Sequence, residues 1–327
     1  MTGQALYFTG DESVAVREQP ISDPGPGQVR VRTERSGISP GTELLVYRGD
    51  VSSELPTDET IDALEGTFSY PLQYGYAAVG RVTDVGAGVD DAWLDRRVFA
   101  FNPHESHFLA DPETLVPTTL PPEQAVFIPN AEAAANFVMD GRPRFGARVA
   151  VFGQGPVGLL TTALLAEFPL SCLVAVDPCG TRRDLSRSLG ADRALAPDDL
   201  DEVDEVDMAV ELSGNPTALD DAIDVTGYAG QVLVGSWYGT KDVSLGLGDA
   251  YHRSHIRIRS SQVSRIDPDH ADRWDKDRRL DAVRAWLAET DLSALHTHTF
   301  DVSRATEAYR LLDERPDDAV QVTLTYD

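Results

Sequence analysis

The stretch from residue 147 to residue 177 constrains the fold most, because it reads in order as a strand, a glycine turn, a helix and a second strand. Residues 149–152 form a continuous apolar run, which is typical of a parallel strand buried on both faces. A second apolar run at 172–176 ends in Asp177. These features predict one βαβ unit, and with it a parallel sheet.

The turn of this unit carries the pattern G-x-G-x-x-G at Gly153, Gly155 and Gly158. The first glycine permits a tight turn, the second lets backbone approach a pyrophosphate, and the third lets the helix pack closely on the strand. Pro156 stands at the first helical position, where its missing N–H costs nothing, and the free N–H groups after it favour an anion. The pattern predicts a dinucleotide site, and a purely structural turn is the alternative.

Asp177 indicates which dinucleotide would bind. It follows Gly158 by nineteen residues, where a carboxylate accepts hydrogen bonds from the adenosine ribose and repels a 2′-phosphate. We therefore expect NAD(H) to be preferred. Arg182 and Arg183 lie close enough in sequence to keep NADP(H) open as the alternative.

The composition excludes several partners. The chain has 327 residues, which favours two domains, and it carries 54 acidic against 28 basic residues. So acidic a surface repels nucleic acid and anionic membranes. Only Lys241 and Lys276 are lysines, and the charge is spread along the whole chain. We infer a halophilic protein from a salt-rich cytoplasm, against the alternative of an ordinary acidic mesophilic enzyme.

Cysteine content and apolar runs bear on the compartment. Cys172 and Cys179 are the two cysteines, which predicts a reducing environment and no disulfide framework. The first residues lack a secretory signal pattern, and no apolar run reaches membrane-spanning length. We expect a soluble cytoplasmic protein.

The hydrophobic pattern divides the chain into two expected domains. Residues 1–130 favour short strands, at 5–8, 14–17, 28–35, 76–85 and 97–101. Strands and helices then alternate, with a helix at 181–189 capped by Thr181 and followed by Gly190, strands at 207–212, 231–236 and 256–263, and a helix from Pro216. Helices at 278–287 and 303–312 and a strand at 319–326 return to the first domain. We therefore expect an α/β protein with domains 1–130 plus 264–327 and 131–263.

Seven stretches resemble the medium-chain dehydrogenase and reductase superfamily over nearly the whole chain. They are SGISPGTELLVYRG at 36–49, YGYAAVGRVTDVG at 74–86, RVAVFGQGPVGLL at 148–160, LGAD at 189–192, VELSGNPTALDDAI at 210–223, GQVLVGSWYG at 230–239 and RIRSSQVSRI at 257–266. The resemblance implies a GroES-like β-barrel domain split around a doubly wound Rossmann domain, with the active site in the cleft between them. It implies cofactor contacts at Gly153, Gly155, Pro156, Val157, Gly158, Asp177, Arg182, Ser213, Gly235 and Ser236.

The chain departs from the zinc enzymes of this superfamily. Ser39 stands where they have a ligand cysteine, and Tyr76 and Ala77 replace the His-Glu of their Gly-His-Glu motif. The third ligand region has no cysteine but contains Glu132, and the cysteines of a structural zinc lobe are absent before Cys172. A catalytic zinc usually takes three protein ligands. We therefore expect no zinc.

His104 and His107 form the remaining metal hypothesis. Their i, i+3 spacing suits a shared site only on a helix, and no third ligand is near in sequence. A histidine that faces the cleft and donates a proton is a stronger interpretation than a metal site. For each of the two histidines taken singly, a position in a surface loop is stronger still.

Without zinc, other groups must manage charge on the substrate oxygen. Thr42 matches the proton-relay hydroxyl of the superfamily, and Tyr76 could share its role, with His104 passing the proton onward. For Tyr76 the alternative is a packed core aromatic. Glu43 matches an acid behind the zinc, which here would only order the loop.

The leading hypothesis is a zinc-independent NAD(H)-dependent oxidoreductase that acts on an alcohol or carbonyl substrate. The motif SGISPGTE is most similar to the branch that contains bacteriochlorophyllide hydroxyethyl dehydrogenase. An NADPH-dependent quinone or enone reductase and a non-catalytic nucleotide-binding redox sensor are the alternatives. We expect a small-molecule substrate and a homodimer or tetramer.

Overall fold

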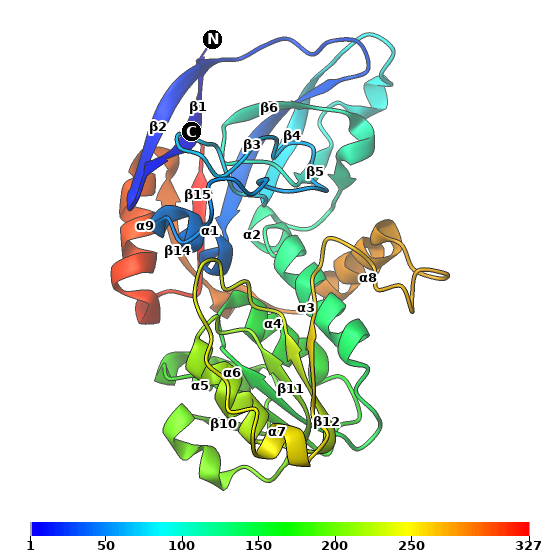
Figure 1. Cartoon of the computed structure of the whole chain (residues 1–327). Helices are drawn as coiled ribbons and strands as arrows, with labels where there is room; N and C mark the ends of the chain where they lie inside the picture. Colours follow the sequence, from blue (N-terminus) through cyan, green and yellow to red (C-terminus); the bar gives the residue numbers. More distant parts are fainter. Residues whose placement is uncertain (1, 327) are drawn as a thin grey trace. The chain divides into compact units, whose positions relative to one another are not determined.

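A computed structural model gives the structure of residues 2–326. The chain divides into two compact units, the first made of Met1–Pro129 and Arg284–Asp327 and the second of Asn130–Val283. The boundaries fall inside the helices α3 (Ile128–Gly141) and α8 (Lys276–Glu289) (Figure 1). These units differ from the expected domains mainly in residues 264–283, which pack with the second unit. The domain boundaries expected from the sequence stay a prediction.

The first unit is mainly antiparallel β structure. Strands β1 (Thr2–Gly10) and β2 (Ser13–Pro20) form a hairpin. The larger sheet has the order β14, β15, β3, β4, β5, β7, with β6 paired to β3. Their bounds, in that order, are His296–Asp301, Gln321–Thr325, Val29–Ile38, Ala78–Val85, Arg97–Ala100, Val116–Pro117 and His107–Ala110. The expected strand 76–85 begins only at Ala78, so Tyr76 precedes it.

Helix α1 (Pro40–Arg48) lies inside the SGISPGTELLVYRG motif and was not predicted as a helix. Pro40 occupies its first turn, and Gly49 ends it with a φ of 72°, a left-handed conformation that glycine adopts readily. The Tyr47 ring stacks on that of Tyr309 in α9 (Ala305–Glu314), with 5.6 Å between their centroids. This packing fixes the orientation of α1. The remaining helix of this unit is α2 (Pro122–Ala125).

The second unit is a six-stranded sheet with the order β10, β9, β8, β11, β12, β13, and every neighbouring pair is parallel. Their bounds, in that order, are Arg193–Leu195, Cys172–Val176, Arg148–Phe152, Val206–Glu211, Thr226–Val234 and Arg257–Ser260. The order follows the 3-2-1-4-5-6 pattern of doubly wound sheets, so the predicted fold of this half is confirmed. Its further helices are α4 (Pro156–Leu165), α5 (Gly180–Ser188), α6 (Pro216–Asp224) and α7 (Ala250–Arg253).

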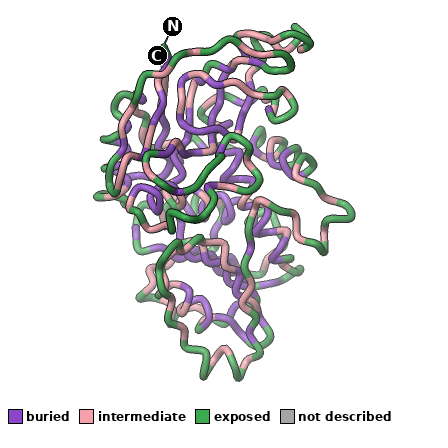
Figure 2. Tube along the Cα trace, turned by 45° about the horizontal axis from the view of Figure 1, so that its top comes forward, coloured by how far each residue is buried: buried purple, intermediate pink, exposed green. Residues whose placement is uncertain are grey.

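The apolar run of β8 is buried on both faces, as predicted. Ala150 and Phe152 belong to one hydrophobic core and Val149 and Val151 to another. Figure 2 shows buried residues along the inner segments of the chain and exposed residues at many of its outer turns. Short 3₁₀ helices lie at Asp91–Trp93, Pro112–Thr114, Pro197–Glu202, Ser293–Leu295, Val302–Arg304 and Pro316–Asp318.

The predicted cap of α5 was wrong. The helix begins at Gly180, Cys179 is its N-cap residue, and no side chain caps it. The physical reason is Asp177, whose carboxylate accepts the Cys179 N–H at 2.8 Å and so fixes the chain just before the helix. Gly190 follows the helix with a φ of 102°, as the sequence indicated.

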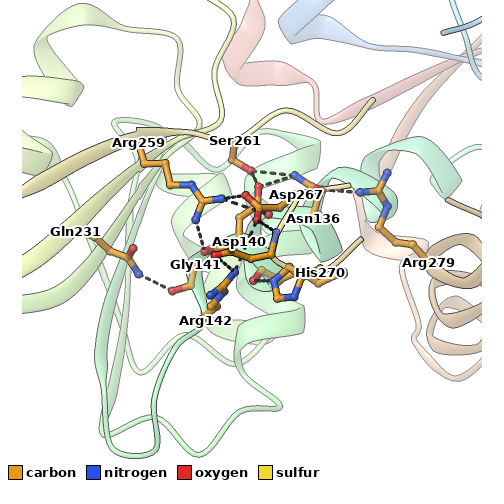
Figure 3. A network of polar contacts seen from close by, with 12 residues as sticks. Asn136, Asp140, Gly141, Arg142, Gln231, Arg259, Ser261, Asp267, His270 and Arg279 are labelled. Carbon is orange, nitrogen blue, oxygen red and sulfur yellow. Dashed lines mark hydrogen bonds and ion pairs between the residues drawn. The ribbon is translucent and has the colours of Figure 1, made fainter. Parts of the chain in front are cut away.

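A buried polar network ties α3 to α8 and to the end of β13 (Figure 3). Arg279, 1% exposed, donates to the Glu132 carboxylate at 2.8 Å and to the Asn136 side-chain oxygen at 2.5 Å. Asn136 in turn donates to Ser261 at 2.9 Å, and Ser261 donates to Asp140 at 2.6 Å. The Arg279 guanidinium therefore compensates a carboxylate that would otherwise be buried and unpaired.

We expect Arg279→Met to lower the free energy of unfolding by about 3–5 kcal/mol, because it leaves the Glu132 charge buried without a partner. Denaturant unfolding measures this. The matched control is Arg310→Met, since Arg310 is exposed on α9. Replacing Glu132 by leucine in the same chain should recover much of the loss. If Arg310→Met lowered the free energy of unfolding equally, Arg279 would not be the residue that compensates the Glu132 charge.

Candidate functional site

The glycine turn of the second unit has the shape that its sequence predicts. Gly153 has a φ of 85°, and an added Cβ would lie 2.6 Å from the Ser213 backbone. A Cβ at Gly158 would lie 1.8 Å from the Gly153 carbonyl oxygen, whereas at Gly155 it would meet nothing within 4 Å. Gly155, the residue expected to face a pyrophosphate, thus borders open space. Pro156 starts α4 directly after it, and no side chain caps this helix.

Asp177 directly follows β9, and its side chain holds the glycine turn. It is 2% exposed, and its two oxygens accept the N–H groups of Gln154 at 2.7 Å and Cys179 at 2.8 Å. A carboxylate offers about four acceptor positions, so lone pairs remain for a ribose. Arg183 donates to the carbonyls of Asp177 and Pro178, both at 2.7 Å. Sequence reasoning assigned Asp177 only to the cofactor and missed its structural bonds.

A buried acid that sequence reasoning missed organises the expected cofactor residues after β11. Glu211 ends this strand, paired with Phe152 in β8 and Val234 in β12. Its carboxylate accepts the N–H of Ser213 at 2.6 Å, the hydroxyl of Ser213 at 2.5 Å and that of Tyr238 at 2.7 Å. The signal that could have found it is an acid at the end of a strand that is otherwise apolar.

The other expected cofactor residues of this region meet at the same carboxyl edge of the sheet. Ser236 accepts the Gly214 N–H at 2.8 Å, and the Gly235 N–H donates to the Glu211 carbonyl at 3.0 Å. Ligands of doubly wound sheets bind at this edge. Val157 and Arg182 lie in the first turns of α4 and α5, the helices that follow β8 and β9.

Three hydroxyls meet in the first unit at the start of α1. The Tyr76 hydroxyl donates to Ser39 Oγ at 2.5 Å, and its oxygen lies 3.2 Å from Thr42 Oγ1. We call Ser39, Thr42 and Tyr76 the hydroxyl cluster. The Tyr76 ring also packs against the hydrophobic core, as the alternative interpretation expects, and the catalytic role of Tyr76 stays a prediction.

Behind the hydroxyl cluster lies a fully buried pair, Glu43 and His104. His104 Nε2 lies 2.9 Å from Glu43 Oε2, and its Nδ1 lies 2.7 Å from Ser36 Oγ. Glu43 also accepts the hydroxyl of Tyr309, and its Oε1 accepts the Ser39 N–H at 2.7 Å. The acid thereby fixes the start of the loop that carries Ser39, which is the ordering role considered for it from the sequence.

The interpretation of His104 as a surface-loop histidine was wrong. The chain buries it because Leu6 donates to its carbonyl at 2.9 Å and because Gly75, with a φ of 110°, leaves room for the ring. An added Cβ at Gly75 would lie 2.5 Å from the imidazole. His107 starts β6 instead, where its Nδ1 lies 3.1 Å from Ser106 Oγ.

Burial keeps the phenols of this site protonated. It raises the pKa of Tyr76, which its hydrogen bonds with Ser39 and Thr42 lower only in part. Burial, and then the Glu43 charge, raise the pKa of Tyr309 well above its usual value. Both phenols are therefore hydrogen-bond donors at neutral pH.

The donor set does not fit a catalytic zinc. The hydroxyl cluster offers neutral oxygens, whereas zinc in proteins takes thiolate, imidazole or carboxylate. The adjacent carboxylate of Glu43 is occupied by His104 and Tyr309, and Glu132 is paired with Arg279. Between residues 2 and 326, no group of three or more histidine, cysteine, aspartate or glutamate side chains could hold a metal.

We expect the free energy of unfolding to fall as the pH rises above about 10, because tyrosines that are neutral in the folded state ionise once the chain unfolds. Because their pKa values are raised in the folded state, this contribution is complete below the unfolded pKa and is lost progressively as the pH rises from there towards the folded pKa. Tyr309→Phe should flatten the decline, and the exposed control Tyr228→Phe should not. Denaturant titrations from pH 8 to 11 measure it, and equal slopes in all three proteins would contradict it.

Comparison with known proteins adds to this geometry. No protein-family model matches the chain. D-guloside 3-dehydrogenase of Escherichia coli K12 is 24% identical over an alignment of 326 residues, and the match covers 91% of this chain and 93% of that one.

Within residues 2–326, no helix has the length and apolar character needed to cross a membrane.

Solved structures share the fold. An alcohol dehydrogenase of E. coli CFT073 in complex with NADH has a TM-score of 0.79 at 19% identity and covers 99% of each chain. A dehydrogenase of Sinorhizobium meliloti 1021, described as zinc-binding and bound to NADP, has a TM-score of 0.77 at 18% identity, again over 99% of each chain. The chain is thus similar over nearly its whole length to dehydrogenases, and it shares the fold of solved dehydrogenase structures.

Proposed function

We propose that this protein is a zinc-independent oxidoreductase that transfers a hydride between NAD(H) and an alcohol or carbonyl substrate. The observation that supports the proposal is the hydroxyl cluster, in which Ser39 and Tyr76 correspond to two metal-ligand positions of the zinc enzymes and Thr42 corresponds to their proton-relay hydroxyl. The dinucleotide turn of the second unit supports the cofactor half of the proposal.

The nicotinamide cofactor, when bound, supplies or accepts the hydride. The open space beside Gly155 and the uncapped N–H groups of α4 suit its pyrophosphate. The remaining lone pairs of Asp177 suit the ribose, and Ser213 and Ser236 stand at the carboxyl edge of the sheet. The similar structures contain NADH in one case and NADP in the other, so the preference for NAD(H) depends on Asp177.

The hydroxyl cluster would bind the substrate oxygen. As an alcohol is oxidised it loses a proton, and in the reverse direction the carbonyl oxygen gains one. While negative charge develops on that oxygen, Thr42 can donate its own hydroxyl proton to it, and Tyr76 can donate once its hydroxyl turns away from Ser39. A hydrogen bond formed at that stage lowers the barrier. The raised pKa of Tyr76 keeps its proton available.

The structure changes the role that we propose for His104. Its ring bonds to Ser36 and Glu43, and no hydrogen bond joins it to Thr42 or Tyr76 among the described residues. The connection to Ser39 runs through the Glu43 carboxylate and a backbone N–H, which does not relay a proton. We therefore assign His104 to positioning Glu43, and the substrate proton to the hydroxyl cluster and water.

The acidic composition supports a salt-rich cytoplasm as the setting of this activity. With 54 acidic and 28 basic residues, self-repulsion is strong at low salt and is screened at high salt.

We expect NADH to bind more tightly than NADPH, because Asp177 accepts ribose hydroxyls and repels a 2′-phosphate. Titrations followed by cofactor fluorescence give both dissociation constants. Asp177→Ser should weaken the binding of both cofactors, since it also frees the N–H groups of Gln154 and Cys179. It should also bring the dissociation constants of NADH and NADPH closer together. Tighter binding of NADPH by the unmodified protein would favour the quinone or enone reductase instead.

We expect Thr42→Ala and Tyr76→Phe to lower kcat by up to the roughly 10²–10⁴-fold that proton transfer contributes, with cofactor affinity nearly unchanged. Secondary alcohols and their ketones provide the test panel, and a deuterated cofactor shows whether hydride transfer limits the rate. Tyr228→Phe, at an exposed tyrosine, is the control. Unchanged rates in both variants, with hydride transfer limiting, would make these hydroxyls packing groups.

A further inference from the structure

A large aromatic side chain stays partly exposed at the carboxyl edge of the sheet in the second unit. Within the described residues of this unit, the exposed large aromatic side chains are Phe145, Phe168, Tyr228 and Trp237. The first three lie before or near the starts of β8, β9 and β12, at the amino edge of the sheet. Trp237 comes after the end of β12 and is 39% exposed. Of these four rings, Trp237 is therefore the one at the edge where doubly wound sheets bind ligands.

The backbone that carries Trp237 is fixed on both sides. Ser236 Oγ accepts the Gly214 N–H at 2.8 Å, and the Tyr238 hydroxyl donates to the buried Glu211 carboxylate at 2.7 Å. The Tyr238 ring also packs against a hydrophobic core. Because both neighbours of Trp237 are held in this way, less order has to be imposed on this segment when a ligand binds.

The direction of the indole follows from the neighbouring side chains. The chain continues from β12 to Tyr238 without a turn or a bend, and side chains alternate between the two faces along such a segment. Val234 and Tyr238 pack against one hydrophobic core. An added Cβ at Gly235 would lie 2.6 Å from the Phe137 ring of α3. The alternation puts Trp237 on the same side as Gly235, away from the core that holds Tyr238.

The strand order indicates which part of a bound ligand lies at β12. In the order β10, β9, β8, β11, β12, β13, the strands β9 and β12 lie on opposite sides of β8 and its glycine turn. Asp177, after β9, is expected to hold the adenosine ribose, so the nicotinamide half extends the other way, over β11 and β12. Trp237 comes after Gly235 and Ser236, which are expected at the cofactor, and its ring is therefore suited to what lies against the nicotinamide, the substrate.

We propose that Trp237 contacts the substrate through its indole ring and favours alcohols and ketones that carry an aromatic ring next to the reacting carbon. The face or edge of an indole packs well against a flat ring, and such a pair adds to the effect of burying apolar surface. This inference rests on the proposed function, because it takes the compound beside the nicotinamide to be an alcohol or a ketone.

The probe is benzamide, a planar amide that resembles an aromatic ketone in shape. It is titrated by calorimetry into the protein saturated with NADH. Trp237→Ala should bind benzamide about tenfold more weakly than the unmodified protein, because the ring pair and its buried surface are lost. Trp237→Phe, which keeps an aromatic ring, should retain most of the affinity. The dissociation constant of NADH alone should stay nearly the same in both variants.

The matched control is Phe145→Ala, which removes an aromatic ring that is 89% exposed at the amino edge of the same sheet. It should leave benzamide affinity unchanged, and thermal unfolding of each variant shows whether the fold is intact. Equal benzamide affinity in Trp237→Ala and the unmodified protein would overturn the proposal. A loss of NADH affinity as large as the loss of benzamide affinity would overturn it too, because the indole would then contact the cofactor.

Turnover separates this inference from the proposed function. With NADH, the unmodified protein should prefer acetophenone to acetone, and Trp237→Ala should reduce the ratio of their kcat/KM values, mainly by raising the KM of acetophenone. Weaker binding of benzamide by Trp237→Ala, without reduction of any ketone by the unmodified protein, would contradict the proposed function and support the indole contact. Reduction of both ketones with the same kcat/KM ratio in the two proteins would overturn the indole contact alone.

Discussion

The buried carboxylate of Glu43 is the constraint on which the candidate site of the first unit depends. It receives hydrogen bonds from the imidazole of His104, the hydroxyl of Tyr309 and the backbone N–H of Ser39. A buried charge is tolerated only when such donors surround it. The requirement ties together α1, α9 and the loop that carries His104. Ser39 and Thr42 are held beside Tyr76 because Glu43 fixes the start of α1.

The second unit uses the same device twice. Asp177 joins the glycine turn to the start of α5, and Glu211 joins the loop after β11 to Tyr238. Each acid lies at the carboxyl end of a parallel strand, at the edge where such sheets bind ligands. Backbone N–H groups and hydroxyls, rather than cations, supply most of their bonds. The acids thus order the loops of the cofactor half before any ligand arrives.

Some of this was predictable from the sequence, because it depends on local chemistry. The glycine turn and the buried strand β8 follow from residue size and periodicity, and the parallel sheet follows from the repeated alternation of strands and helices. The helix α1 was missed because a proline, a glycine and a threonine at its start suggest a loop, and tertiary packing of Tyr47 on Tyr309 overrides that preference. The burial of His104 was missed because its partners Ser36 and Glu43 lie more than sixty residues away.

The central claim is that neutral hydroxyls, positioned by Glu43, replace zinc in the chemistry of this protein. Metal analysis of protein purified without a histidine tag, followed by turnover before and after chelation, tests it most directly. The account predicts no stoichiometric zinc and a rate that chelation leaves unchanged. The account would be contradicted if each chain held one zinc ion, if chelation removed both the zinc and the activity, and if adding zinc restored the activity.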